Sequence, residues 1–312
     1  MHQYKKHDSQ ETPLLTSSKQ IAPDFFIIGV QKSGTTWLWE MLEQHPGTSL
    51  PAEKEIHYFG STELFAKGDD WYYSYFSGLD PDKATGEAST SYFYDRIPYW
   101  YNKSDQIEFD ESLPPLPESI DRKFPDAKFI VILRDPVRRA ISAYSHWMKQ
   151  GNLSPTLGLK RIATEMPKMR IIEFGLYAKY LDAWMKQIPA DRFRVILFEE
   201  QIMKNWNQTL YDTYDYLGLE PNFKPVHPEN PSHKSWGWNR IVFNYYAGKL
   251  FRNIHNSTIS KLIGRVDFLS NNAIHREDIE YLRSCYLPEK EKIASLLGRD
   301  LSCWDYGEKL LQ

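Results

Sequence analysis

The fold of this chain is decided by the sequence FFIIGVQKSGTTW, which occupies residues 25–37. It opens on an almost continuous apolar run, which is typical of a strand covered on both faces of a parallel sheet. A polar turn bracketed by Gly29 and Gly34 follows the run. Residues at helical spacing come next and end before Pro46 and Gly47, namely Trp37, Leu38, Met41, Leu42 and His45. The stretch therefore predicts a strand, a turn and a helix in direct succession.

Two further apolar runs, at residues 129–133 and 193–198, repeat this arrangement. After the first of them, Asp135 can cap a helix and Pro136 suits its first position. Such repetition predicts an α/β fold with a parallel central sheet and flanking helices, in which ligands bind at the carboxyl ends of the strands. The irregular stretch at residues 151–167 is interpreted as a surface loop or an insertion.

The composition indicates a folded protein, since 41% of the 312 residues are hydrophobic and 25% are charged. We expect residues 1–22 to form a flexible polar tail and residues 23–312 to form one domain. The tail has no apolar run, so we expect no stable membrane insertion, and a cytoplasmic location is favoured over the Golgi lumen. The net charge of −3 gives no general attraction to nucleic acid, and any anion site must be built locally. For Cys285 and Cys303, two reduced thiols are favoured over one bridge.

The turn after the first strand has the features of an anion-binding loop. Its glycines let successive amide N–H groups point inward, and the following helix N-terminus adds positive potential. A triphosphatase loop places lysine directly after its second glycine, but here Thr35 stands there and the lysine lies inside the loop, at Lys32. Six residues are predicted to bind the anion, namely Gln31, Lys32, Ser33, Gly34, Thr35 and Thr36. A magnesium-dependent kinase built on this loop is the runner-up interpretation.

Sulfuryl transfer explains the displaced lysine. A transferring sulfuryl group carries less negative charge than a phosphoryl group, so Lys32 and the loop amides can stabilise the leaving phosphate without a divalent metal. The sequence shows no set of histidine, cysteine and carboxylate residues at ligand spacing, because Glu55-Ile56-His57 stands alone. We therefore predict that no metal is required.

A second anion site is predicted where the strand at residues 129–133 ends. Arg138 and Ser142 are four residues apart on the expected helix and share a stripe close to Arg134. Guanidinium groups combined with a hydroxyl commonly bind a phosphate monoester. Two anion sites at neighbouring strand ends suit a nucleotide with phosphates at its 5′ and 3′ positions.

Residues 26–37 and 133–144 resemble the 5′-phosphosulfate loop and the 3′-phosphate element of sulfotransferases that use 3′-phosphoadenosine 5′-phosphosulfate (PAPS). The resemblance extends over most of the chain from Pro23 onward. It implies a fold like that of the P-loop-containing nucleoside triphosphate hydrolases, with PAPS as the donor. It also implies that Arg134 and Ser142 bind the donor.

The segment at residues 54–59 resembles the acceptor-side segment of the heparan-sulfate branch of that family. The resemblance implies that Glu55 is the general base and that His57 supports it. A late loop resembles the one that folds over the donor in this family, which implies donor binding by three further residues, Ser232, His233 and Lys234. The implied acceptor is a hydroxyl or amine of a carbohydrate.

One position departs from the heparan-sulfate branch, whose enzymes usually carry a lysine after the glutamate of the segment at residues 86–92. This chain has Ala88 there, which favours a less charged glycan or a glycolipid as the acceptor. A carbohydrate-binding module that uses the aromatic residues of segment 71–76 is the non-enzymatic alternative. We expect most of those rings to belong to the core.

Overall fold

The protein is described by a computed structural model that covers residues 20–94, 114–229, 240–243, 245–246 and 274–311. Its sheet has four parallel strands in the order β2-β1-β3-β4. The strands are β1 (Phe25–Gly29), β2 (Gly86–Ala88), β3 (Lys128–Leu133) and β4 (Phe193–Leu197). The predicted α/β class with a parallel sheet is therefore confirmed, and the three apolar runs form three of these strands. The sequence does not predict the short strand β2.

Side chains of the strands alternate between two apolar clusters on opposite faces of the sheet. Along β1, Phe26 and Ile28 belong to one cluster, whereas Phe25 and Ile27 belong to the other. All four side chains are buried. Because both faces are covered, these strands are apolar throughout instead of alternating with polar residues.

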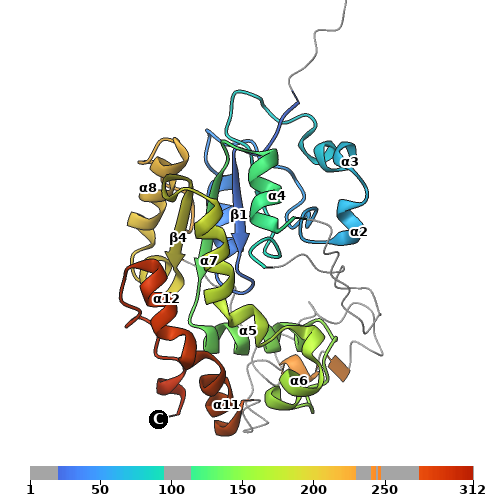
Figure 1. Cartoon of the computed structure of the whole chain (residues 1–312), viewed down its shortest axis with the longest axis vertical. Helices are drawn as coiled ribbons and strands as arrows, with labels where there is room; N and C mark the ends of the chain where they lie inside the picture. The colour runs from blue at the N-terminus through green and yellow to red at the C-terminus, as the bar shows by residue number, and fades with distance from the viewer. Residues whose placement is uncertain (1–19, 95–113, 230–239, 244, 247–273, 312) are drawn as a thin grey trace, which may run out of the picture.

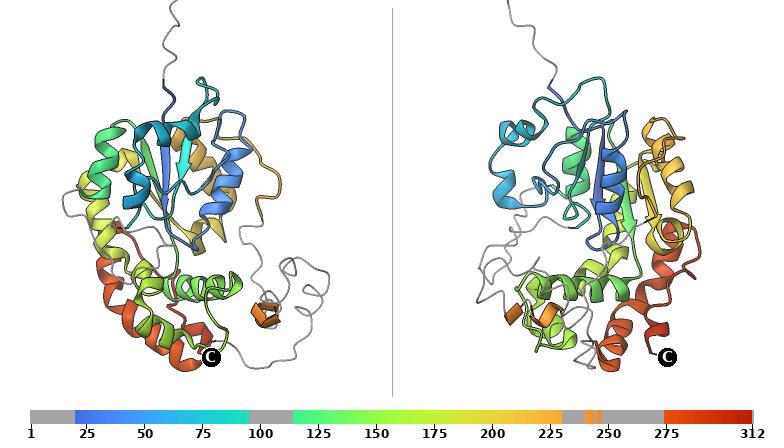
Figure 2. Two further views of the ribbon diagram at one scale, coloured as in Figure 1. Left: turned by 90° about the vertical axis from the view of Figure 1, so that its right-hand side faces the viewer. Right: turned by 180° about the vertical axis from the view of Figure 1, so that it is seen from behind.

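Helices from distant parts of the chain cover the two faces (Figure 1, Figure 2). On one side lie α4 (Leu116–Lys123) and α7 (Tyr177–Gln187), and on the other lie α1 (Thr35–Glu43) and α8 (Trp206–Leu217). The Tyr214 hydroxyl of α8 donates a hydrogen bond of 3.2 Å to the carbonyl of Met41 in α1. This bond fixes the two helices beside each other.

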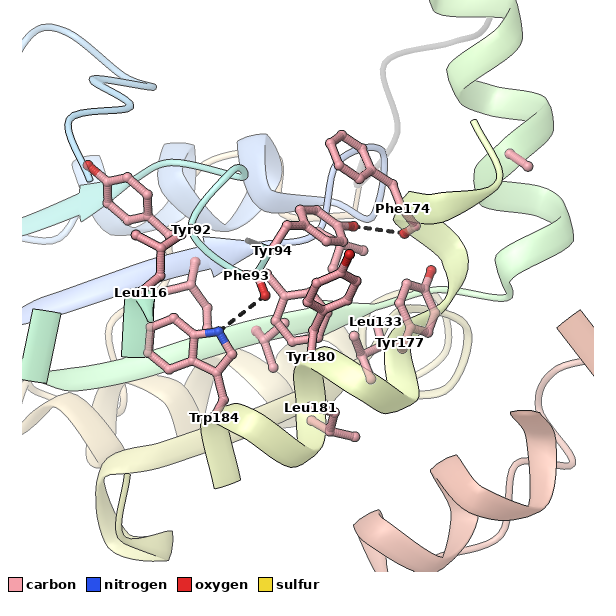
Figure 3. Close-up of a cluster of buried hydrophobic side chains, with 14 of the residues drawn as sticks. Tyr92, Phe93, Tyr94, Leu116, Leu133, Phe174, Tyr177, Tyr180, Leu181 and Trp184 are labelled. Carbon is pink, nitrogen blue, oxygen red and sulfur yellow. Dashed lines mark hydrogen bonds between the residues drawn. The ribbon is translucent and has the colours of Figure 1, made fainter. Parts of the chain in front are cut away.

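The cluster under α7 is rich in aromatic rings whose polar ends are hydrogen-bonded (Figure 3). Trp184 Nε1 donates to the carbonyl of Phe93 at 3.2 Å, and the Tyr94 hydroxyl donates to the carbonyl of Phe174 at 2.7 Å. The amide of Phe93 also donates to the carbonyl of Ile28 at 2.9 Å. The segment that follows β2 is therefore held firmly against β1.

Helix α5 (Pro136–Lys149) lies across the end of the sheet at which the strands end (Figure 1). The Asp135 side chain caps it by accepting hydrogen bonds from the amides of Val137 at 2.9 Å and Arg138 at 3.1 Å. Pro136 takes the first helical position. The predicted cap and helix start are both confirmed.

The stretch at residues 151–167, interpreted as a loop or an insertion, is not irregular throughout, because it contains helix α6 (Leu159–Glu165). Leu159 and Ile162 lie on one face of this short helix and are buried. Asp278, from helix α11 (Arg276–Tyr286), accepts a hydrogen bond from the amide of Lys160 at 2.9 Å. Contacts with a distant part of the chain therefore stabilise a helix too short to be stable alone.

The remaining helices are short, and the aromatic residues of segment 71–76 lie among them. Tyr72 and Phe76 are buried and the other rings pack against the same cluster, so the expected core role is confirmed.

No helix in the described part of the chain is long and apolar enough to cross a membrane. Three further α-helices are α2 (Thr62–Phe65), α3 (Asp69–Tyr73) and α12 (Lys290–Leu297). The 3-10 helices are η1 (Ser74–Phe76), η2 (Pro167–Met169), η3 (Glu173–Gly175), η4 (Ala190–Arg192), η7 (Leu287–Glu289) and η8 (Glu308–Leu310), and η5 (Phe198–Ile202) is a π-helical turn.

The strand order places a topological switch beside β1. The chain passes from β1 to β2 on one side and then returns to β3 on the other side. Ligands of open α/β sheets bind outside the carboxyl ends of the strands at such a reversal. The turns that follow β1 and β3 are therefore the expected place for the site.

Candidate active site

The turn after β1 forms a loop whose backbone can receive an anion. Lys32 has a φ of 69° and Gly34 a φ of 96°, so both lie in the left-handed region. Helix α1 then begins at Thr35 with no side-chain cap and no acidic residue in its first turn. The first amides of α1 are therefore available to a bound anion.

Ser33 provides a second sign that this loop is built for a ligand. Its side chain is fully buried, and its Oγ has no hydrogen-bond partner among the described residues. Buried hydroxyl groups are normally paired, so an unpaired one inside an anion loop fits a ligand oxygen. The residues present therefore fit a phosphate or phosphosulfate group.

Lys32 lies in a positive environment. Burial and the charges of Lys149 and Arg134 lower its pKa to about 8, while Glu55 acts in the opposite direction. The ammonium is still the main form at neutral pH. A cation with charged neighbours of the same sign is stabilised by an anion placed beside it.

Glu55 is held by three side chains from two segments of the chain. Its Oε1 lies 3.1 Å from Lys54 Nζ, and its Oε2 lies 3.1 Å from His57 Nε2. The Thr90 hydroxyl donates a hydrogen bond to the same Oε2 at 3.0 Å. Burial raises the pKa of Glu55, but the hydrogen bond with His57 and the charge of Lys54 outweigh it and lower the pKa to about 2. The side chain is therefore a carboxylate at neutral pH.

Lys54 connects this carboxylate with the anion loop. Its Nζ lies 3.4 Å from Thr36 Oγ1 as well as 3.1 Å from Glu55 Oε1. The predicted base and the predicted phosphate loop are thus brought together by one ammonium group. The sequence does not assign a role to Lys54.

The backbone around Glu55 is fixed by the segment that follows β2. The amide of Glu55 donates to the carbonyl of Ala88 at 2.9 Å, and the amide of His57 donates to Ser89 Oγ at 2.9 Å. His57 Nδ1 also lies 2.8 Å from Ser91 Oγ. Glu55 and His57 have φ values of 68° and 57°, conformations that need such support.

Glu87 is a buried carboxylate that anchors this support. It accepts hydrogen bonds from the hydroxyls of Tyr72 and Tyr92, both at 2.6 Å, and from Ser89 at 2.7 Å. Burial raises the pKa of Glu87, and the three hydroxyl donors oppose that effect. Ser89 thus links Glu87 to the backbone of His57. Sequence reasoning missed this group, because the short strand β2 that buries Glu87 is not predicted from the sequence.

Arg134 approaches the loop from the end of β3. It donates a hydrogen bond of 2.9 Å to the carbonyl of Lys32, and its guanidinium lies 4.8 Å from the centre of the Phe198 ring. Glu199 Oε1 lies 3.8 Å from Arg134 Nε. Burial raises the pKa of Glu199 to about 7, although the charge of Arg134 opposes the shift. This acidic neighbour is not anticipated from the sequence.

Comparison with known proteins decides the family. The sequence pattern described as "Sulfotransferase family" matches residues 23–225, which is more than half of the chain. The chain belongs to the sulfotransferase family. The prediction of a PAPS-dependent sulfotransferase is therefore confirmed.

Individual sulfotransferases are similar to the chain over most of its length. Heparan sulfate glucosamine 3-O-sulfotransferase 5 of Mus musculus is 29% identical over 314 residues, which cover 97% of this chain and 80% of the relative. Heparan sulfate glucosamine 3-O-sulfotransferase 3B1 of the same species is 27% identical over 294 residues, or 92% of this chain and 66% of the relative. The resemblance to the heparan-sulfate branch is thereby confirmed.

A solved sulfotransferase also shares the fold. The sulfotransferase of Alicyclobacillus acidocaldarius has a TM-score of 0.62 and 24% sequence identity, and the match covers 91% of this chain and 99% of that protein. This likeness concerns the architecture alone. It agrees with the predicted P-loop-like fold.

Most of the predicted residues of this sulfotransferase site meet at the carboxyl ends of β1, β2 and β3. Ser142 lies half-buried on α5, and Arg138 of the same helix is paired with Asp305 at 2.8 Å. The structure therefore supplies an acidic partner for Arg138 that the sequence does not predict. The residues near the loop and the predicted base are Gln31, Lys32, Ser33, Gly34, Thr35, Thr36, Glu55, His57 and Arg134.

The predicted late loop lies outside the described residues, including Ser232, His233 and Lys234. The chain before it reaches Pro228, whose carbonyl accepts a hydrogen bond from Trp37 Nε1 at 2.9 Å. Cys285 and Cys303 are free thiols. Among the described residues, no three histidine, cysteine or carboxylate groups are arranged to hold a metal ion.

Proposed function

We propose that this sulfotransferase transfers the sulfuryl group of PAPS to a hydroxyl or amine of a carbohydrate acceptor, with Lys32 stabilising the leaving phosphate and Glu55 acting as the base. One observation carries the proposal. Lys54 joins Thr36 of the anion loop to the Glu55 carboxylate through contacts of 3.4 and 3.1 Å. A donor held by the loop and an acceptor beside Glu55 would therefore be neighbours.

The loop has the groups needed to hold the donor. The unpaired Ser33 hydroxyl, the first amides of α1 and the Lys32 ammonium all suit the 5′-phosphosulfate. Arg134 and Ser142 are assigned to the 3′-phosphate by the resemblance to the family, and Ser232, His233 and Lys234 to the loop over the donor. PAPS supplies an activated sulfuryl group whose leaving group is a phosphate.

Glu55 is suited to receive the acceptor proton because it is ionised at neutral pH. In the transfer, the acceptor oxygen or nitrogen bonds to sulfur while the bond from sulfur to the bridging phosphate oxygen breaks. That oxygen keeps the electron pair, and the acceptor proton passes to Glu55. The Lys32 ammonium would stabilise the charge that develops on the leaving phosphate. His57, held by Ser91, keeps the Glu55 carboxylate in place.

A carbohydrate acceptor is proposed from the relatives, whose names describe sulfation of heparan sulfate glucosamine. Ala88 is buried and uncharged, so it offers no cation to a polyanionic chain. This observation favours a glycan of low charge or a glycolipid. The same site would accept a hydroxyl or an amine, since Glu55 can take a proton from either.

The proposal is tested by measuring label transfer from sulfur-labelled PAPS to a panel of glycans and glycolipids. We expect transfer to at least one carbohydrate and a loss of about a hundredfold or more in Lys32→Ala, because one preorganised stabilising group typically has that effect. Lys83→Met is the matched control, since it removes a lysine from an exposed ion pair with Asp80. Full activity of Lys32→Ala would contradict the role of Lys32. Activity toward no carbohydrate but toward another class of acceptor would contradict the acceptor class.

A further inference from the structure

We propose that Lys54 is a further donor-binding residue, whose ammonium binds the sulfonate oxygens of PAPS and pairs with Glu55 when no donor is present. The inference deepens the proposed function and rests on it. Its basis is the position of one cation between two parts of the site. Lys54 Nζ lies 3.4 Å from Thr36 Oγ1, in the first turn of α1, and 3.1 Å from Glu55 Oε1.

The side chain can exchange partners without movement of the backbone. The exposed fraction is 19% for the Lys54 side chain and 31% for that of Glu55, so the pair is partly open to solvent. The adjoining backbone is held in place, because the amide of Glu55 is bonded to the carbonyl of Ala88. Rotation of the lysine end alone would bring the ammonium to an anion placed between Thr36 and Glu55.

Lys54 and Arg134 flank the loop from opposite sides of β1. Arg134 extends from the end of β3 and bonds the carbonyl of Lys32, whereas Lys54 precedes Glu55, whose amide bonds the carbonyl of Ala88 at the end of β2. The two cations therefore address different parts of a ligand in the loop. Lys54, on the side of the acceptor base, is the one placed for the group that is transferred.

Movement of the Lys54 ammonium from Glu55 to the sulfonate would also change the basicity of Glu55. In the structure Lys54 pairs with Glu55 Oε1, while His57 and Thr90 contact Oε2. Movement of the ammonium to the sulfonate frees Oε1 to receive the acceptor proton. The charge and hydrogen bond of Lys54 are among the causes that lower the pKa of Glu55, so their removal makes Glu55 a stronger base. The donor would thus prepare the base that acts on its own sulfuryl group.

The test compares two nucleotides that differ only in the sulfonate, with no acceptor present. Calorimetry would measure the affinities of PAPS and of adenosine 3′,5′-bisphosphate for the wild-type protein, Lys54→Met, Lys54→Arg and the control Lys83→Met. We expect Lys54→Met to weaken PAPS binding by about tenfold or more, as for the loss of a charge-assisted hydrogen bond, and to leave the bisphosphate unchanged. Lys54→Arg should keep most of the preference for PAPS.

Three results would overturn the inference. If Lys54→Met bound both nucleotides as tightly as the wild type, the sulfonate would have another partner. Equal losses of affinity for both nucleotides would show that Lys54 stabilises the loop instead of binding the sulfonate. If the wild type bound neither nucleotide, both the proposed function and this inference would be wrong. The first two results would contradict only the inference about Lys54 and would leave the proposed function unaffected.

Discussion

The guanidinium of Arg134 donates a hydrogen bond of 2.9 Å to the backbone carbonyl of Lys32. The bond joins the end of β3 to the loop after β1, across the point where the order of the strands reverses. It also holds Lys32 at a φ of 69°, a conformation that a lysine rarely adopts unaided. One arginine therefore supports the loop and supplies it with charge.

Replacing Arg134 with lysine should weaken nucleotide binding although the charge is kept. A lysine cannot bond the carbonyl of Lys32 and still offer a planar fork to a phosphate. We expect the affinity for adenosine 3′,5′-bisphosphate to fall by about tenfold. The control is Arg192→Lys, because Arg192 bonds the carbonyl of Ala127 at 3.1 Å, before β3 begins. Equal affinities of Arg134→Lys and the wild type would exclude this role.

Glu199 should make nucleotide binding depend on pH. Burial raises its pKa to about 7, so it is mostly neutral at pH 6 and mostly ionised at pH 8. Ionisation places a negative charge beside Arg134 and opposes anion binding. The affinity of Glu199→Gln divided by that of the wild type should therefore rise from pH 6 to pH 8, and this ratio cancels the titration of the ligand itself. A ratio that does not change with pH would contradict the prediction.

Asp135→Ala should destabilise the protein by about 2–4 kcal/mol, the effect of a lost cap plus a buried amide left unpaired. Besides capping α5, Asp135 accepts a hydrogen bond from the amide of Tyr306 at 2.7 Å. Urea unfolding would measure the change in the free energy of unfolding. Asp182→Ala is the control, since it removes only an exposed ion pair with Lys186 and should change stability by less than about 1 kcal/mol. Similar losses in the two variants would show that the cap has no special role.

Gly34→Ala should impair the anion loop beyond the strain of its backbone angle. A Cβ at Gly34 would lie 3.0 Å from the ring of Phe198, the same ring that packs under Arg134. Gly78→Ala is a matched control, because Gly78 has a φ of 82° but nothing within 4 Å of the added Cβ. We expect both variants to lose some stability and only Gly34→Ala to lose nucleotide affinity. Unchanged affinity of Gly34→Ala would show that the loop tolerates the contact.

The parts of the fold that the sequence predicts are those set by local patterns. The apolar runs of β1, β3 and β4 and the cap at Asp135 are visible because each needs only neighbouring residues. Strand β2 is only three residues long, and it is stabilised by its pairing with β1 instead of by its own pattern. Helix α6 depends in the same way on Asp278 of α11.

The residues of the site also divide into those that the local sequence predicts and those that only the folded chain brings together. The loop around Lys32 can be predicted because its glycines, lysine and hydroxyl residues are adjacent in the sequence. The pairing of Arg138 with Asp305 and the support of His57 by Ser89 join residues that are far apart in the chain. Such partners depend on how the whole chain folds, so the sequence cannot reveal them. Lys54 begins the segment at residues 54–59, but only its contacts with Thr36 and Glu55 indicate a role.

The central claim, that Glu55 takes the acceptor proton in a PAPS-dependent transfer, is tested most directly by the rate of Glu55→Gln. The control is Glu53→Gln, which changes an exposed glutamate two residues earlier in the chain. Glu55→Gln should still bind adenosine 3′,5′-bisphosphate. With a carbohydrate acceptor and labelled PAPS, its rate of sulfate transfer should fall by about a hundredfold or more. Transfer by Glu55→Gln at the rate of Glu53→Gln and the wild type would contradict the account.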